Sequence, residues 1–397
     1  QSYLNMEQII SATMVSGADA IHPGFGFLSE NARFAELCEK CGITFVGPPS
    51  KVIRMLGNKK IARSTMIAAG VPVVPGSEGD VEDIETGLKE AERIGYPVII
   101  KAALGGGGKG MRVANTPEEF PEAYATARKE SEIAFGDGTM YIEHFVVNPR
   151  HIEFQILADS FGNVIHLGER DCSIQRNHQK MIEESPSAAV SSELREKMGH
   201  AAVTAAKAAG YVNAGTIEFL LEPDGKFWFM EMNTRIQVEH PVTEWVTGID
   251  LVKEQLKIAS GMPLEISQED VRIQGHAIEC RINAENPQKN FRPSPGTIQG
   301  AHFPGGNGIR VDTCVYNGCK IPPYYDSMLA KLIVHAGNRK EAIAKMQSAL
   351  GEVIIDGIDT NIDYQYEILK DEDYQSGNFD TGFLASHIIA GVKINEN

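Results

Sequence analysis

A run of four glycines, residues 105–108, lies between two segments that we predict to be strands, Val98 to Ala102 and Met111 to Ala114. Glycine loses more conformational freedom on ordering than any other residue, so this run indicates a loop. Its letters match the G-x-G-x-x-G dinucleotide pattern, but that fold needs a helix directly after the loop, where we expect a strand. The phosphate-loop pattern of NTPases fails as well, because no serine or threonine follows Lys109.

Two interpretations of this loop remain. Glycine N–H groups can approach phosphates without a side-chain clash, and Lys101 and Lys109 flank the run, which favours a lid over bound phosphates. The alternative is a mobile surface hairpin loop. We favour the lid, and we expect it to span about residues 74–145, or Pro72 to Phe145 at its widest.

A second predicted hairpin, Gly215 to Asn233, carries two carboxylates. Its Asp-Gly pair at 224–225 is typical of a two-residue turn, which would place Glu218 directly opposite Glu231. Like charges opposed on a sheet repel each other, so we expect a cation between them. Two carboxylates and the amide oxygen of Asn233 suit Mg²⁺ or Mn²⁺. A solvated pair of acids is the alternative, and the aromatic side chains on the same face disfavour it.

Alternate polar residues continue beyond the hairpin as Arg235, Gln237 and Glu239. If the chain stays extended, all three point toward the metal side. Arg235 would then hold an anion, and Glu239 would act as a general base if Arg235 and Lys180 do not over-stabilise its charge. We expect His240-Pro241 to end the strand.

Composition limits the possible partners. The 397 residues carry a net charge of −16, which argues against binding to nucleic acid or to an anionic membrane surface. The polar segment Glu169 to Lys180 is a candidate phosphate-binding loop within this acidic chain. No apolar stretch reaches the ~20 residues that span a bilayer, and six cysteines fit a reducing, cytoplasmic compartment.

The first residues of the chain alternate between predicted strands and helices, which is typical of a parallel sheet covered by helices. Ser29 is the expected N-terminal cap of a helix from Glu30 to Cys41.

Seven motifs carry a family resemblance along nearly the whole chain. They are HPGFGFLSENARFA from His22, KAALGGGGKGMRV from Lys101, NPRHIEFQ from Asn148, ERDCSIQRNHQK from Glu169, FMEMNTRIQVEHPVTE from Phe229, GHAIECRINAE from Gly275 and PPYYDSML from Pro322. In this order the chain resembles the biotin carboxylases of the ATP-grasp superfamily, the first-half enzymes of acetyl-CoA carboxylase.

The resemblance implies a multidomain α/β and α+β fold. A partial Rossmann-like N-terminal unit would occupy residues 1–56, an ATP-grasp domain with a mobile lid 57–266, and a mixed α+β C-terminal domain 276–385. Relatives begin about one βαβ unit earlier, so we expect the chain to be truncated at its N-terminus.

The resemblance also implies roles for single residues. The ATP contacts would be Lys59, Lys101, Gly106, Gly107, Glu143, His144, Val146, His151, Gln175, His178, Leu220, Glu218 and Glu231. The metal ligands would be Glu218, Glu231 and Asn233, and bicarbonate would meet Lys180, Arg235, Gln237, Val238 and Glu239. Biotin would lie at Phe25, Gly26 and Arg281, with Phe25 standing where relatives often have tyrosine. Catalysis would rest on Lys180, Arg235, Glu239 and Arg281.

The implied activity is ATP- and bicarbonate-dependent carboxylation of biotin through carboxyphosphate, as in fatty acid biosynthesis, with Mg²⁺ or Mn²⁺. Biotin would be supplied on a biotin carboxyl carrier protein, with carboxyltransferase subunits as further partners and a homodimer as the assembly. Alternatives are the biotin carboxylase domain of a pyruvate or acyl-CoA carboxylase, another ATP-grasp ligase, and a nucleotide-sensing scaffold without catalysis.

Overall fold

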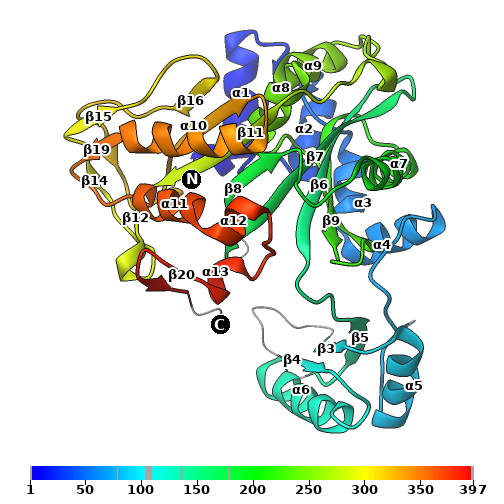
Figure 1. Cartoon of the computed structure of the whole chain (residues 1–397). Helices are drawn as coiled ribbons and strands as arrows, with labels where there is room; N and C mark the ends of the chain where they lie inside the picture. The colour runs from blue at the N-terminus through cyan, green and yellow to red at the C-terminus, as the bar shows by residue number, and fades with distance from the viewer. Residues whose placement is uncertain (1, 78, 103–109, 136, 178, 395–397) are drawn as a thin grey trace. The chain divides into compact units, whose positions relative to one another are not determined.

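The computed structural model of the chain describes residues 2–77, 79–102, 110–135, 137–177 and 179–394. They form two compact units, which we describe separately (Figure 1). The first unit comprises Gln1–Val71, Arg150–Leu221 and Phe229–Glu396. The second comprises Pro72–Pro149 and the hairpin tip Glu222–Trp228.

An eight-stranded sheet is the centre of the first unit. Its strand order is β10 (Phe227–Asn233), β9 (Asn213–Leu221), β6 (Arg150–Ala158), β7 (Val164–Arg176), β8 (Gln179–Ser185), β11 (His276–Asn283), β18 (Met328–Ala336) and β16 (Ile309–Thr313). The pairs from β9 through β16 are antiparallel, so the strands of the ATP-grasp and C-terminal motifs join one continuous sheet.

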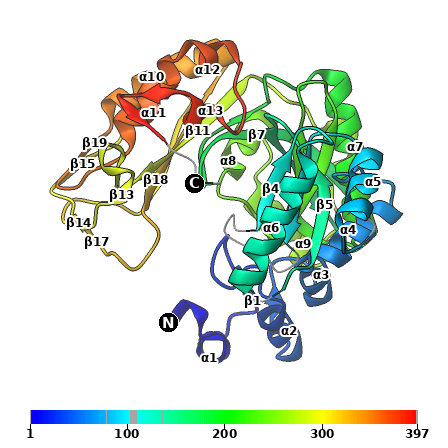
Figure 2. The same cartoon turned by 90° about the horizontal axis from the view of Figure 1, so that it is seen from below.

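Helices cover this sheet and the loops around it (Figures 1 and 2). They are α1 (Met6–Ser16), α2 (Ala32–Lys40), α3 (Ser50–Leu56), α4 (Lys59–Ala68), α7 (Ser192–Ala208), α8 (His240–Thr247), α9 (Leu251–Ala259), α10 (Arg339–Glu352), α11 (Ile362–Lys370), α12 (Glu372–Ser376) and α13 (Phe383–Ser386). Three 3₁₀ turns occupy Ser2–Leu4, Gln268–Asp270 and Pro287–Lys289.

Short strand pairs complete the first unit. Parallel β1 (Ala20–Ile21) and β2 (Thr44–Phe45) lie in its N-terminal part. The antiparallel pairs are β12 (Glu285–Asn286) with β13 (Arg292–Pro293), β14 (Gly296–Thr297) with β17 (Lys320–Ile321), β15 (Gly300–His302) with β19 (Ile354–Asp356), and β20 (Ile388–Ile389) with β21 (Val392–Lys393).

The two faces of β11 serve different purposes, because successive side chains of a strand point to opposite sides. Ile278, Cys280 and Ile282 are fully buried in the apolar core that α10 covers. Ala277 packs on the other face with Val242 and Val246 of α8. The residues that follow on that face are Glu279 and Arg281, so this face becomes charged toward the end of the strand.

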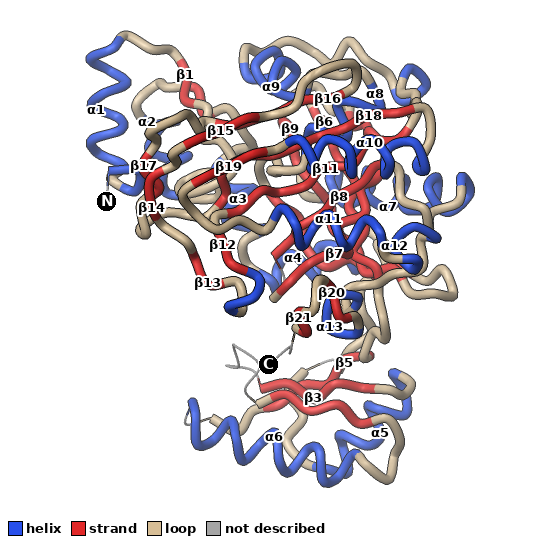
Figure 3. The backbone as a smooth tube through the Cα atoms, turned by 60° about the vertical axis from the view of Figure 1, so that its left-hand side comes forward, coloured by secondary structure: helices blue, strands red, loops and turns tan. Residues whose placement is uncertain are grey.

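The second unit is a three-stranded antiparallel sheet, β4 (Met111–Ala114), β3 (Val98–Ala102) and β5 (Met140–His144), with α5 (Ile84–Ile94) and α6 (Phe120–Phe135) (Figure 3). Val98 and Ile100 point into an apolar core with Phe120 of α6. Lys101 alternates to the other face of β3, where its Nζ lies 2.5 Å from Glu143 Oε2. This unit therefore presents one apolar face to its helices and one charged face.

Three local predictions are wrong. Asn31, not Ser29, caps α2, because its side chain accepts the Phe34 N–H at 2.9 Å. The turn after β9 has three residues, since the Glu222 N–H donates to the Lys226 carbonyl at 2.8 Å, and Gly225 takes a left-handed φ of +86°. This shifts the pairing next to the turn by one residue from the predicted register. His240-Pro241 does not end a strand but begins α8, where proline fits the first turn.

No helix among the described residues is long and apolar enough to cross a lipid bilayer.

A buried arginine stabilises the middle of the sheet. Arg170 of β7 is 0% exposed, and its Nε donates to Glu153 Oε1 of β6 at 2.5 Å. Its Nη1 donates to Gln155 Oε1 at 2.8 Å and to Thr243 Oγ1 of α8 at 2.9 Å. These bonds reach both a neighbouring strand and a covering helix, so the guanidinium holds β6, β7 and α8 together.

We predict that Arg170→Met lowers the free energy of unfolding by about 3–5 kcal/mol, because the buried Glu153 loses one of its two cationic partners. Urea unfolding followed by circular dichroism would measure the loss. Arg272→Met is the matched control, since Arg272 is exposed, and it should change stability little. Equal effects of the two substitutions would contradict the structural role of Arg170.

Candidate active site

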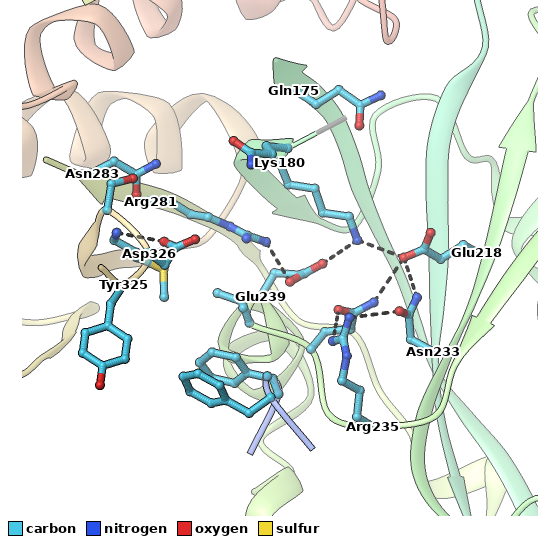
Figure 4. A pocket seen from close by; sticks show the side chains of 18 of the residues that line it. Gln175, Lys180, Glu218, Asn233, Arg235, Glu239, Arg281, Asn283, Tyr325 and Asp326 are labelled. Atoms are coloured by element: carbon cyan, nitrogen blue, oxygen red, sulfur yellow. Dashed lines mark hydrogen bonds and ion pairs between the residues drawn. The ribbon is translucent and has the colours of Figure 1, made fainter. Parts of the chain in front are cut away.

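A cleft of about 1210 Å³ opens on the first unit at the charged end of the sheet. It brings together residues from the N-terminal part, from β6, β8, β9, β10 and β11, and from the loop before α8 (Figure 4). The predicted site residues that line it are Phe25, Gly26, Lys59, His151, Gln175, Lys180, Glu218, Glu231, Asn233, Arg235, Gln237, Val238, Glu239 and Arg281.

Lys180 is the central cation of this cleft. Its Nζ lies 2.5 Å from Glu153 Oε2, 2.6 Å from Glu239 Oε1 and 3.1 Å from Glu218 Oε1. Burial lowers the pKa of a lysine, but the three surrounding carboxylates outweigh it and hold the pKa of Lys180 well above its usual value. The ammonium group therefore remains charged at neutral pH.

Glu239 bridges two cations. Its Oε1 meets Lys180, and its Oε2 accepts a hydrogen bond from Arg281 Nη2 at 2.9 Å (Figure 4). Burial raises the pKa of this carboxyl, but Lys180 and Arg281 overcome that effect and hold the pKa well below its usual range. Glu239 is thus a weak base in this arrangement.

The loop before α8 orients this carboxylate. Extended pairing stops at Asn233, yet Arg235, Gln237 and Glu239 all line the cleft. Glu239 is the residue before α8, and its side chain makes no capping bond, so it stays available to the cleft. Lys331 of β18 donates to the Val238 carbonyl at 2.8 Å and holds the loop backbone in place.

Arg235 is held on both sides. Its Nε donates to Glu30 Oε2 at 2.9 Å, its Nη1 to Gln237 Oε1 at 2.7 Å, and its Nη2 to Asn233 Oδ1 at 3.0 Å. The bond to Glu30 ties the N-terminal part of the chain to the cleft. These contacts fix the plane of the guanidinium, which suits it to bind a planar anion.

The candidate metal ligands lie together at one side of the cleft. Glu218 Oε1 accepts hydrogen bonds from Asn233 Nδ2 at 2.8 Å and Gln237 Nε2 at 3.1 Å, and its Oε2 lies 3.1 Å from His151 Nε2. Burial together with the nearby charge of Glu218 raises the pKa of Glu231. Two carboxylates that repel each other, beside an amide oxygen, are hard donors that fit Mg²⁺ or Mn²⁺.

Other predicted nucleotide residues belong to the second unit. Lys101 and Glu143 form an ion pair there, and His144 Nε2 lies 3.5 Å from Glu222 Oε1. Val146 follows β5 in the same unit. Leu220 lies on β9 in the first unit but does not line the cleft. Gly106, Gly107 and His178 lie outside the described residues.

Sequence reasoning missed several residues of this site. Glu153 contacts both Arg170 and Lys180, and Glu183 Oε1 accepts from Arg281 Nε at 2.6 Å. Both glutamates are fully buried. For Glu153 the signal available in the sequence was a charged residue between Ile152 and Phe154, because such a residue needs a partner when buried. Glu183 carries no such signal, because its strand is mostly polar.

Comparisons with known proteins agree with this geometry. Residues 1–53 match the family described as "Biotin carboxylase, N-terminal domain", 58–267 match "Carbamoyl-phosphate synthase L chain, ATP binding domain", and 279–386 match "Biotin carboxylase C-terminal domain". The chain is 57% identical over 391 residues to Biotin carboxylase 1 of Bacillus subtilis, covering 98% of this chain and 87% of that relative.

Two solved structures widen the comparison. The biotin carboxylase component of a pyruvate carboxylase superposes with a TM-score of 0.89 and is 53% identical, over 96% of this chain and 85% of that one. The biotin carboxylase domain dimer of 2-oxoglutarate carboxylase from Hydrogenobacter thermophilus, solved with MgADP, ADP and bicarbonate, superposes with a TM-score of 0.85. It is 52% identical over 96% of this chain and 84% of that one.

The sheet, the cleft and the matches to known families and structures define an ATP-grasp ligase. They also confirm the predicted multidomain α/β and α+β fold class. The chain belongs to the biotin carboxylase family, as the seven sequence motifs predicted, and it is an ATP-dependent biotin carboxylase.

We predict that Lys180→Met destabilises the protein more at pH 8 than at pH 5.5. Without Lys180, burial is opposed by fewer cations, so the folded-state pKa of Glu239 rises relative to the wild-type protein. The folded variant then binds more protons than the folded wild-type protein, so the difference in stability between them widens as pH rises.

Melting temperatures of wild type and Lys180→Met at the two pH values would measure this difference. Lys207→Met is the control, since Lys207 is exposed on α7. A gap between wild type and Lys180→Met that stays constant with pH would contradict the electrostatic role of Lys180.

Proposed function

We propose that the cleft holds bicarbonate between Lys180 and Arg235 and carboxylates biotin beside Arg281. The observation that carries this proposal is the bridge in which Glu239 bonds both Lys180 and Arg281, at 2.6 and 2.9 Å. The carboxylate of Glu239 thus lies between Lys180, which we assign to bicarbonate, and Arg281, which we assign to biotin. The relative solved with MgADP and bicarbonate supports this substrate set.

Nucleotide phosphates would be held by Lys59 and Lys101, with the segment about 74–145 as the lid. Glu218, Glu231 and Asn233 would hold Mg²⁺ or Mn²⁺, which when bound neutralises charge on the phosphates. The remaining ATP contacts are proposed at Glu143, His144, Val146, His151, Gln175, His178 and Leu220, with Gly106 and Gly107 in the lid.

The chemistry follows from the charges around Glu239. Bicarbonate that reaches Lys180 and Arg235 competes with Glu239 for the N–H groups of Lys180, which raises the basicity of Glu239. Glu239 then takes the bicarbonate proton, and the bicarbonate oxygen attacks the γ-phosphorus of ATP. The bond from that phosphorus to the ADP oxygen breaks, and carboxyphosphate and ADP result. Gln237 and Val238 would complete the bicarbonate contacts.

The second step transfers CO₂. Carboxyphosphate breaks to CO₂ and phosphate in the closed cleft. The released phosphate takes the ureido N–H proton of biotin, and negative charge develops on the ureido oxygen. Arg281 stabilises that charge while the deprotonated nitrogen forms its bond to the carbon of CO₂. Phe25 and Gly26 line the same cleft and would contact biotin.

We further propose that biotin arrives on a carrier protein, that carboxyltransferase subunits complete an acetyl-CoA carboxylase, and that the chain forms a homodimer. The dimer described for the Hydrogenobacter thermophilus relative supports the last point. The similar structure from a pyruvate carboxylase keeps pyruvate open as an alternative final acceptor. Assay of the purified protein with candidate biotinylated carriers would separate these acceptors.

We predict that Arg281→Ala reduces biotin carboxylation ~10²–10³-fold, which corresponds to about 2.7–4 kcal/mol of transition-state stabilisation. The bicarbonate-dependent ATPase that runs without biotin should stay largely intact, because Arg281 is assigned to biotin. Release of ADP with and without biotin measures both activities. If both fall equally, Arg281 belongs to the bicarbonate machinery.

We predict that Glu231→Gln raises the Mg²⁺ concentration needed for ATP binding by roughly tenfold or more, since a charged ligand is lost. Titration calorimetry of ATP at a series of Mg²⁺ concentrations would test this. Glu193→Gln, on the exposed start of α7, is the control. An unchanged Mg²⁺ dependence in Glu231→Gln would remove Glu231 from the metal site.

A further inference from the structure

Two buried carboxyl groups lie directly behind Arg281. Glu183 of β8 and Glu279 of β11 are paired across the antiparallel ladder, and both are 0% exposed. Residues paired in this way share one face of the sheet, with Cβ atoms roughly 4.5–5.5 Å apart. Arg281 is two residues beyond Glu279 on β11, so it shares that face as well.

The hydrogen bonds of this pair are incomplete. Glu183 Oε1 accepts from Arg281 Nε at 2.6 Å, whereas Glu183 Oε2 receives no hydrogen bond from a described residue. Neither oxygen of Glu279 has a described hydrogen-bond partner. Leaving three buried carboxyl oxygens without a donor is costly, and leaving two opposed negative charges is more so.

One proton relieves both costs. If Glu279 is protonated, its O–H can donate to Glu183 Oε2, and the pair carries one negative charge instead of two. That charge stays on Glu183, where Arg281 already bonds it. Burial, together with the charge of the partner carboxylate, raises the pKa of Glu279 well above its ordinary value, in agreement with this arrangement.

We propose that Glu183 is a positioning residue for Arg281, and that its charged form accepts a hydrogen bond from a protonated Glu279. Glu183 Oε1 accepts a hydrogen bond from Arg281 Nε and also lies 2.6 Å from Arg281 Nη2, which donates to Glu239 Oε2 at 2.9 Å. A guanidinium held at two of its nitrogens keeps one orientation toward the cleft. The role of Arg281 toward biotin rests on the proposed function, whereas the proton between the two glutamates does not.

The surroundings offer few other charges to this pair. The titratable groups that interact with Glu183 or Glu279 are Lys180 on β8, Arg281 and Cys280 on β11, Lys331 on β18, Cys172 on β7 and Glu239 before α8. Lys331 lowers the pKa of Glu279, but it does not outweigh burial, and its Nζ donates to the Val238 carbonyl and lies 3.3 Å from Asp312 Oδ2. Arg281 is therefore the cation that Glu183 bonds directly.

Kinetics of Glu183→Gln test the positioning role. We expect kcat for biotin carboxylation to fall ~10-fold or more, while KM for ATP changes less than about twofold. Burial raises the pKa of Glu183 to about 7, with Arg281 opposing the shift. The wild-type rate should therefore rise with pH near 7, as Glu183 becomes charged, and Glu183→Gln should lack this limb.

Glu184→Gln is the matched control. Glu184 is the next residue on β8 and is similarly buried, but it bonds His276 and Arg339 and does not touch Arg281. This substitution should lower the melting temperature and leave the pH limb in place. If Glu183→Gln and Glu184→Gln alter the carboxylation kinetics alike, Glu183 is merely structural and the positioning role is wrong.

The shared proton has its own test. Infrared difference spectra of the whole protein should show the C=O stretch of a protonated carboxyl group that Glu279→Gln abolishes and Glu184→Gln retains. Absence of that band in the wild-type protein would overturn the proton assignment. Because this measurement needs no turnover, it separates failure of the inference from failure of the proposed function, which would appear as wild-type protein unable to carboxylate biotin.

Discussion

A line of alternating charges through the sheet is the constraint on which this structure depends. Arg170 bonds Glu153, Glu153 bonds Lys180, and Lys180 bonds Glu239. Glu239 then bonds Arg281, which bonds Glu183. Each charge is buried or nearly so, and a buried charge is tolerated only when an opposite charge or donor meets it. Removing one member therefore disturbs both neighbours, which couples stability to the chemistry of the cleft.

The same arrangement sets the basicity of Glu239. Lys180 and Arg281 keep this carboxyl group charged, so it is a weak base in the structure described. In the function we propose, bicarbonate engages Lys180 and weakens one of the two contacts that stabilise the carboxylate, which increases its basicity. The antiparallel sheet brings these charges together, because its register places β8 and β11 side by side.

The sequence predicted the bounds of some strands correctly but not the register of the hairpin, and both outcomes have physical reasons. Strands Val98–Ala102 and Met111–Ala114 were predicted with their observed bounds, because apolar alternation and the glycine run delimit them. The register of the hairpin near Asp224 was not, because an Asp-Gly pair fits both a two-residue turn and a three-residue turn with left-handed glycine. Glu218 and Glu231 still share the cleft, so the predicted grouping of the acids did not depend on the exact turn.

By itself the sequence determined the family, the fold class and the types of side chain available to the site, because motif spacing and apolar periodicity are local properties of the chain. Only the tertiary structure decided which charges meet. Glu153, Lys180 and Glu239 are distant in sequence, and tertiary folding alone brings both carboxylates within 2.6 Å of one ammonium group. Glu183 and Glu279 became a pair for the same reason: strand pairing, which no local pattern encodes, set them opposite each other.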